Sequence, residues 1–254
     1  MLRASTSRAT SRLPRLRRHA VTVAVTAVAL LAAPGLESVA SGAAAPQQAP
    51  TSAVSAAAGR ANTSIRFLDF DHTRGWLQFA YIRGQVTATK GGTHGALKGA
   101  HVRVYRKLDS QKTFHYLATR STGTRPYPRF EFRTRALGNA VYKVVFRGNS
   151  SYQRTADATR VLVHRSMRAD LEDGTGRFHG VVRPKYIHRT VYLEKRSCAS
   201  CPWRKMRHSR TGDHGLFAFN VPAPRSGRWW WRASTPASGR FIWSYTGVFT
   251  TQLS

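Results

Sequence analysis

The sequence predicts an all-β protein built from two similar β-sandwiches in tandem. Its strand pattern occurs twice, over residues 82–163 and 178–251, at an offset of 87 to 89 residues. This offset suits a whole sandwich domain, whereas propeller blades repeat about every 40 residues. The corresponding positions are Val102 and Val191, Val104 and Leu193, Phe114 and Trp203, Phe130 and Phe217, Phe132 and Phe219, Tyr142 and Trp229, and Tyr152 and Phe241.

Residues 1–40 have the three-part form of a secretory signal peptide. Arginines within residues 3–18 precede an uncharged stretch over 20–33, and small residues follow up to Ala40, after which we expect cleavage. The apolar run is too short for a bilayer core of about 30 Å, which argues against an uncleaved anchor. The Arg17–Arg18 pair leaves the export route open.

Residues 41–63 are predicted to form a flexible linker, because they are mostly Ala, Ser, Pro and Gln and contain almost no large apolar side chain. No later apolar run is long enough to span a membrane. We therefore expect a secreted protein, either extracellular or associated with the cell surface, with no transmembrane segment in the mature chain.

Alternating apolar residues predict half-buried strands in the first repeat. Gly and Pro separate these segments at the spacing of turns in an all-β domain. The side chains predicted to face the core are Val102 and Val104, Phe130 and Phe132, and Tyr142, Val144 and Phe146.

The first repeat resembles a bacterial immunoglobulin-like repeat of secreted and surface proteins. The segments that carry the resemblance are 82–86, 99–106 and 142–152, within residues 78–164. The resemblance implies a Greek-key sandwich of about seven strands, with turns at Gly84, at Gly99–Ala100 and at the closing Phe-x-Gly-x-x-x-Tyr segment. It implies no catalytic residue. A carboxypeptidase-regulatory-like or collagen-adhesin-like sandwich shares some of these elements and is the alternative fold.

The second copy keeps the segments 178–182 and 217–219, but residues 234–238 replace the closing turn. The domain boundaries predicted from the repeat are 64–165 for the first immunoglobulin-like sandwich and 166–254 for the second.

Cys198 and Cys201 lie between two predicted strands, at the tip of a hairpin. In an oxidising compartment this pair is expected to form a disulfide. A redox role would place the first Cys at a helix N-terminus, and a zinc site would need two further ligands in a recognisable spacing. We therefore expect a structural disulfide, no metal site and no cofactor.

Three consecutive tryptophans, 229–231, stand out in the second repeat. The repeat places Trp229 and Trp231 on the core face, so that Trp230 and Arg232 face outward. An outward Trp beside Arg is a candidate stacking platform for a sugar ring or a nucleobase, and Trp243 and Tyr245 could extend it. The alternative is that Trp230 packs within the protein, for example against an Arg.

The chain is strongly basic, with a net charge of +30. Without residues 1–40, which hold six Arg and one Glu, 35 basic and ten acidic side chains remain, a net charge of +25. Such a field attracts anionic wall polymers, acidic polysaccharides and other glycans, or nucleic acid through charge alone. Solubility and coding bias are the alternative explanation.

Nothing in the sequence matches a catalytic motif such as Gly-x-Ser-x-Gly or His-Glu-x-x-His. Asp69 and Asp71 are only a weak calcium signal because no coordinating loop accompanies them. We therefore expect a secreted, non-enzymatic binding or spacer module of the cell envelope, with acidic polymers or glycans as candidate ligands. The alternative is an exported enzyme or enzyme inhibitor with a loop-borne site; the oligomeric state is not predicted.

Overall fold

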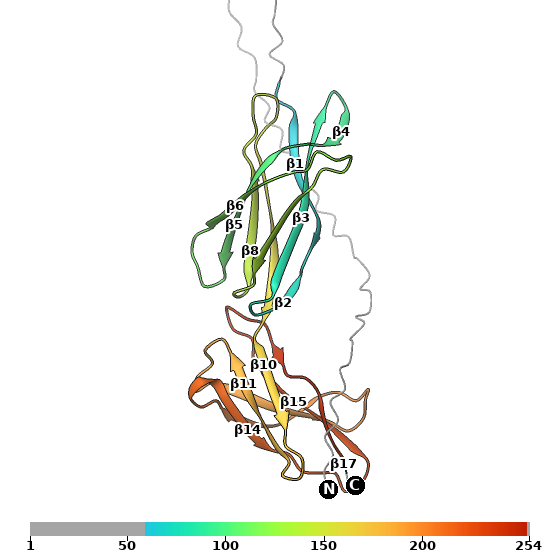
Figure 1. Ribbon diagram of the computed structural model, residues 1–254, viewed down its shortest axis with the longest axis vertical. Coiled ribbons are helices and arrows are strands. Elements are labelled where there is room, and N and C mark those ends of the chain that lie inside the picture. The colour runs from blue at the N-terminus through green and yellow to red at the C-terminus, as the bar shows by residue number, and fades with distance from the viewer. Residues whose placement is uncertain (1–58, 253–254) are drawn as a thin grey trace, which may run out of the picture. The chain divides into compact units, whose positions relative to one another are not determined.

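The computed structural model describes residues 59–252, which form mainly strands and turns (Figure 1). One short 3₁₀ turn, η1 (Asp213–Gly215), lies between two strands. The predicted signal peptide and residues 41–58 of the predicted linker lie outside the described residues. The first strand begins at Asn62, so the last two positions of the predicted linker already belong to a sheet. The predicted all-β class is confirmed for the described part of the chain.

The first sandwich consists of two sheets. In one sheet the central strand β3 pairs with β1 on one side and with β7 and β4 on the other. The other sheet has the order β2-β9-β8-β5-β6, in which only the β2–β9 pair is parallel. The strands are β1 (Asn62–Phe70), β2 (Thr73–Gly75), β3 (Phe79–Lys90), β4 (Thr93–Ala96), β5 (His101–Leu108), β6 (His115–Ser121), β7 (Phe130–Arg135), β8 (Ala140–Phe146) and β9 (Thr155–His164).

The second sandwich repeats this arrangement. One sheet has the order β10-β11-β14, and the other has the order β13-β12-β15, with β16 and β17 both pairing with β15. The strands are β10 (Ser166–Leu171), β11 (Arg177–Arg183), β12 (Thr190–Arg196), β13 (Arg204–Arg210), β14 (Leu216–Asn220), β15 (Arg228–Thr235), β16 (Ser244–Tyr245) and β17 (Phe249–Gln252).

The strand order identifies both units as immunoglobulin-like Greek-key sandwiches. In each, the first, second and fifth main strands form one sheet, and the third, sixth and seventh form the other, flanked by the fourth. The chain therefore crosses between sheets after the second strand and again after the fourth and fifth. This order favours the immunoglobulin-like fold over the carboxypeptidase-regulatory-like alternative.

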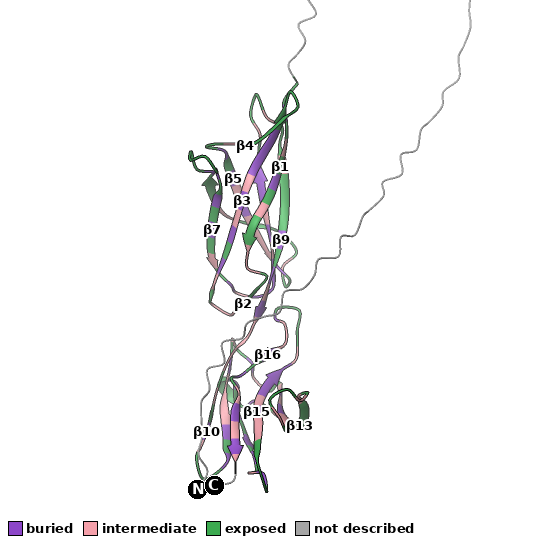
Figure 2. Cartoon of the chain, turned by 90° about the vertical axis from the view of Figure 1, so that its right-hand side faces the viewer, coloured by how far each residue is buried: buried purple, intermediate pink, exposed green. Residues whose placement is uncertain are grey.

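Alternate residues of the central strands fill the two cores (Figure 2). On β8, Tyr142 and Val144 are almost completely buried against Val102 and Val104 of β5. Burial raises the pKa of the Tyr142 hydroxyl, and the nearby Arg106 opposes this shift. Burying one such large side chain contributes roughly 1.5–3 kcal/mol, so a few aromatic residues supply much of the stability of each small core.

The register of the strands corrects the alignment of the two repeats at this point. Val104 pairs with Val144 in the first sandwich, and Leu193 pairs with Ala233 in the second. Tyr142 therefore corresponds to Trp231 instead of Trp229. Because side chains alternate with a period of two, this shift of two residues leaves the inward and outward sets unchanged, and Trp231 is buried as expected.

Gly84 does not mark a turn, as the family resemblance implied, but lies inside β3 opposite Phe130. A Cβ atom at Gly84 would come within 2.6 Å of the Phe130 ring and 2.7 Å of the carbonyl oxygen of Arg66. Gly180 of β11 has the same role opposite Phe217, whose ring would lie 2.8 Å from an added Cβ. Both glycines are needed because an aromatic ring of the neighbouring strand covers them.

A smaller apolar cluster surrounds Val163 near the end of β9. Val163 packs with Trp76, Ala136 and Phe241, and its carbonyl oxygen accepts a hydrogen bond from the Ile242 amide at 3.0 Å. Only one residue separates the end of β9 at His164 from the start of β10 at Ser166.

Candidate functional site

The predicted site residues lie on the outward side of the sheet β13-β12-β15 in the second sandwich. Because Trp231 and Ala233 are buried in the core, Trp230 and Arg232 of β15 point to the opposite side. The neighbouring strand β12 adds outward side chains at alternate positions. We call this surface the stacked face; it consists of Tyr192, Glu194, Arg196, Trp203, Lys205, Trp230, Arg232, Trp243 and Tyr245.

Arg232 is held inside the stacked face. Its Nε donates a hydrogen bond of 2.7 Å to Oε2 of Glu194, and the Ser234 hydroxyl donates one of 2.7 Å to Oε1 of the same carboxylate. The guanidinium carbon lies 4.3 Å from the ring centre of Trp203 and 4.0 Å from that of Tyr245. The charge of Arg232 is therefore balanced by a buried carboxylate, and two aromatic rings cover the guanidinium group.

Arg196 and Trp230 form the next part of the stacked face. The two residues are partners across β12 and β15. The guanidinium carbon of Arg196 lies 4.7 Å from the ring centre of Trp203 and 5.9 Å from that of Trp230. Within residues 59–252, no carboxylate forms an ion pair with Arg196. Trp230 thus lies beside a cation whose charge is not neutralised by the described part of the protein.

Trp243 lies beside a second cation on the same face. The Lys205 ammonium is 4.3 Å from the ring centre of Tyr192 and 4.8 Å from that of Trp243, and the two rings are 6.3 Å apart. The structure thus brings the four predicted residues onto one face, although Arg232 separates Tyr245 from Trp203. Their role in ligand binding stays a prediction.

Sequence reasoning missed five residues of the stacked face. The repeat matches Trp203 to Phe114 but gives it no role in binding. The other four are recognisable only from the pairing of β12 with β13 and β15. Glu194 is the most informative of them because it is buried and binds Arg232. The five residues are Tyr192, Glu194, Arg196, Trp203 and Lys205.

The disulfide between Cys198 and Cys201 is confirmed, with Cα atoms 5.0 Å apart. It closes the hairpin between β12 and β13, next to Trp203 of the stacked face. Among residues 59–252, no group of three or more His, Cys, Asp or Glu side chains has a geometry that could hold a metal ion.

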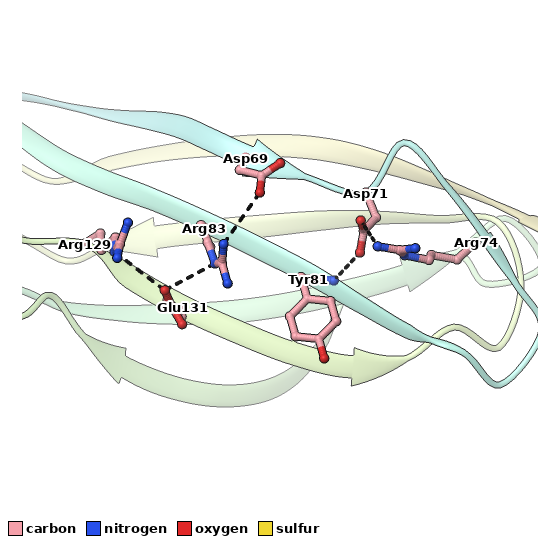
Figure 3. A network of polar contacts seen from close by, with 7 residues as sticks. All are labelled: Asp69, Asp71, Arg74, Tyr81, Arg83, Arg129 and Glu131. Carbon is pink, nitrogen blue, oxygen red and sulfur yellow. Dashed lines mark hydrogen bonds and ion pairs between the residues drawn. The ribbon is translucent and has the colours of Figure 1, made fainter. Parts of the chain in front are cut away.

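Three carboxylates of the first sandwich, Asp69, Asp71 and Glu131, pair with arginines (Figure 3). Asp71 pairs with Arg74 and accepts a hydrogen bond of 2.8 Å from the Tyr81 amide. Arg83 lies 3.7 Å from Asp69 and 3.2 Å from Glu131, and Glu131 also pairs with Arg129 at 3.6 Å. Asp69 and Asp71, the two residues of the weak calcium signal, thus pair with Arg83 and Arg74 respectively.

No protein-family model and no curated protein matches the sequence. Among solved structures, the chain is similar to the alpha chain of the chicken interferon gamma receptor, with 8% identity, a TM-score of 0.37, and coverage of 76% of this chain and 97% of the receptor chain. It is also similar to a marsupial T cell receptor, with 12% identity, a TM-score of 0.29, and coverage of 73% and 63%. These values are too low to bear on function. In the part of the chain that the structure describes, no helix is long and apolar enough to cross a membrane.

Proposed function

We propose that this chain is an exported, non-catalytic binding module of the cell envelope that binds an acidic glycan on the stacked face. One observation carries the proposal: aromatic rings and cations alternate across a single sheet face, and Arg196 and Lys205 are not paired with a carboxylate among the described residues. Arg232 and Glu194 serve as the support that holds Trp203 and Tyr245 in position.

The chemistry of an acidic sugar matches this alternation. An indole can cover the apolar C–H face of a sugar ring, as it covers other flat or apolar surfaces. A guanidinium or ammonium group beside the ring can then pair with a carboxylate on the same sugar. Trp230 with Arg196, and Trp243 with Lys205, each provide one ring and one cation.

Two features support the location. Residues 1–40 have the order of charges, apolar residues and small residues that directs export. The disulfide lies at an exposed hairpin tip, and such bonds persist in oxidising compartments.

The test is a titration of the mature chain, residues 41–254, with oligogalacturonate, a polymer of carboxylated sugars. Trp230→Ala should weaken binding by about 1–3 kcal/mol, by analogy with the range for nucleobases that stack on aromatic side chains, and should leave the salt dependence almost unchanged. Tyr127→Ala is the control, because Tyr127 is 82% exposed and lies in the first sandwich, away from the stacked face.

Unchanged binding by Trp230→Ala would contradict the proposal. Release of shortened oligomers during the titration would instead support the alternative of an exported enzyme.

A further inference from the structure

The first sandwich gathers cations on the outward side of its sheet β9-β8-β5-β6. On β5, the outward residues Arg103, Tyr105 and Lys107 pair with Val145, Lys143 and Val141 of β8. On the other side of β8, Ala158 and Ala156 of β9 lie opposite Lys143 and Val145. Long basic side chains of this surface therefore alternate with small Ala and Val side chains on the neighbouring strands. We call this surface the open face; it consists of Arg103, Tyr105, Lys107, Phe114, Lys143, Val145, Arg147 and Arg154.

Among residues 59–252, no carboxylate forms an ion pair with a cation of the open face. Among the described residues, ion pairs engage Arg74, Arg83 and Arg129 around the acidic cluster of Figure 3, whereas none engages a basic residue of the open face. On this sheet an ion pair joins Arg160 of β9 to Asp109. Five like charges without a counterion raise the local potential, and an anion that binds between them relieves the repulsion. The five cations are Arg103, Lys107, Lys143, Arg147 and Arg154.

Two adjoining hollows lie on this surface. One, of about 400 Å³, is lined by Tyr105, Phe114, Lys143, Val145, Arg147 and Arg154. The other, of about 650 Å³, extends from Arg103 and Arg147 towards Lys98 and His101. Arg147 lines both hollows. Each has the volume of a small-ligand site, so the pair can hold consecutive units of a polymer.

Aromatic rings flank cations in and beside the smaller hollow. The ammonium groups of Lys107 and Lys143 lie 5.4 Å and 5.6 Å from the centre of the Phe114 ring. Tyr105 and Tyr116 meet edge to face with centres 5.8 Å apart. These rings offer apolar surface for a sugar, but they present no parallel pair of faces on which successive nucleobases would stack.

The cation–ring–cation arrangement of the open face recurs in the stacked face. By strand register, Lys107 corresponds to Arg196 and Lys143 to Arg232, and each pair flanks a ring, Phe114 in one sandwich and Trp203 in the other. The position that pairs with the β8 or β15 cation differs, since it is Tyr105 in the first sandwich and Glu194 in the second. The open face thus lacks the carboxylate that neutralises its counterpart.

We infer that the open face is a second, separate binding site, which takes consecutive carboxylated sugars of a uronate polysaccharide. The sugar rings lie over Phe114 and Tyr105, and their carboxylates pair with Lys143, Arg147 and Arg154. This site shares the ligand class of the proposed function but none of its residues, so either can fail without the other.

The test compares two triple variants of the mature chain that lose the same charge. Lys143→Ser, Arg147→Ser and Arg154→Ser remove cations from the open face. Arg66→Ser, Lys90→Ser and Arg168→Ser remove exposed cations elsewhere. Binding of oligogalacturonate is measured over a range of salt concentrations, each in the Trp230→Ala background and in the otherwise natural chain. Thermal unfolding verifies that both variants fold.

The open-face variant should bind at least about tenfold more weakly and with a smaller salt dependence, because fewer counterions are released. The control variant should change binding less than about twofold, since its cations do not contact the polymer. This difference should persist in the Trp230→Ala background, which separates the open face from the proposed function.

Equal weakening by the two triple variants would overturn the inference, because it would show a diffuse effect of net charge. Tighter binding of single-stranded DNA or polyphosphate than of the uronate at the same salt concentration would overturn the ligand class. A measurement without substitutions provides an independent check: oligogalacturonate should protect Lys107 and Lys143 from acetylation but not Lys90. Equal reactivity of the three lysines with and without the polymer would also refute the site.

Discussion

The stacked face and the open face occupy the same position in two sandwiches of the same strand order, yet they treat their cations differently. Arg232 is neutralised by a buried carboxylate and covered by two rings. Lys143, at the corresponding position, faces Tyr105 and has no ion-pair partner among residues 59–252. One position on the adjacent strand, Glu194 or Tyr105, therefore decides whether a cation supports the protein or is available to an anion.

The charged residues of the two faces therefore have different roles, one in stability and the other in electrostatic attraction. A buried ion pair holds its surroundings because removal of one partner leaves an uncompensated charge. Exposed, unpaired cations contribute little to folding but much to the electrostatic potential. We therefore expect substitutions in the stacked face to change stability more, and those in the open face to change salt-dependent binding more.

The largest expected effect is that of Glu194→Gln. The substitution leaves Arg232 mostly buried without its counterion and should lower the free energy of unfolding by about 3 kcal/mol, measured by urea denaturation. Glu131→Gln is the control, because its pairs with Arg83 and Arg129 are about half exposed and surface pairs are worth less than about 1 kcal/mol. Similar losses in both variants would remove the distinction between supporting and available charges.

Substitution of the corresponding core glycines should destabilise the two sandwiches to a similar extent. Gly84→Ala and Gly180→Ala each place a methyl group against an aromatic ring and a carbonyl oxygen, and each should cost about 1–3 kcal/mol by overpacking. Gly95→Ala is the control, since an added Cβ there meets nothing within 4 Å. A loss in only one sandwich, read from its own unfolding transition, would show that the cores are not equivalent.

The disulfide distinguishes the two hairpins that carry Phe114 and Trp203. The Cys198→Ser/Cys201→Ser double variant should lose about 1–2 kcal/mol, because the closed loop is short. It should also bind oligogalacturonate more weakly, since Trp203 follows the disulfide closely. Denaturation together with the binding titration tests both effects, and a reduced sample of the unmodified chain should behave like the variant. Complete unfolding of the double variant would show that the disulfide stabilises the fold far more than closure of a short loop predicts.

The substitution with the smallest expected effect gives the open face the carboxylate that the stacked face has. Tyr105→Glu introduces a carboxylate opposite Lys143, as Glu194 lies opposite Arg232. It should weaken uronate binding about fivefold by neutralising one cation of the open face, and it should change the unfolding free energy little. Tyr105→Gln, which removes the ring without adding charge, separates the two causes. If Tyr105→Glu bound as well as the natural chain, the comparison of the faces would lose its basis.

Much of the architecture follows from local patterns. The alternation along 142–146 and 229–233 predicted which side chains face the core. The prediction stayed correct although the alignment of the repeats was wrong by two residues, because side-chain direction has a period of two. The disulfide was equally predictable, since only three positions separate the two cysteines and both lie at a hairpin tip.

The sequence by itself thus determined the all-β class, the inward and outward residues of the strands and the disulfide, because each depends on neighbours within a few residues. Only the tertiary structure decided which outward residues meet: Glu194 with Arg232, Trp203 with two arginines, and Lys143 with Tyr105. Cross-strand contacts depend on register, and a shift of two residues that leaves the core intact gives every outward side chain new neighbours.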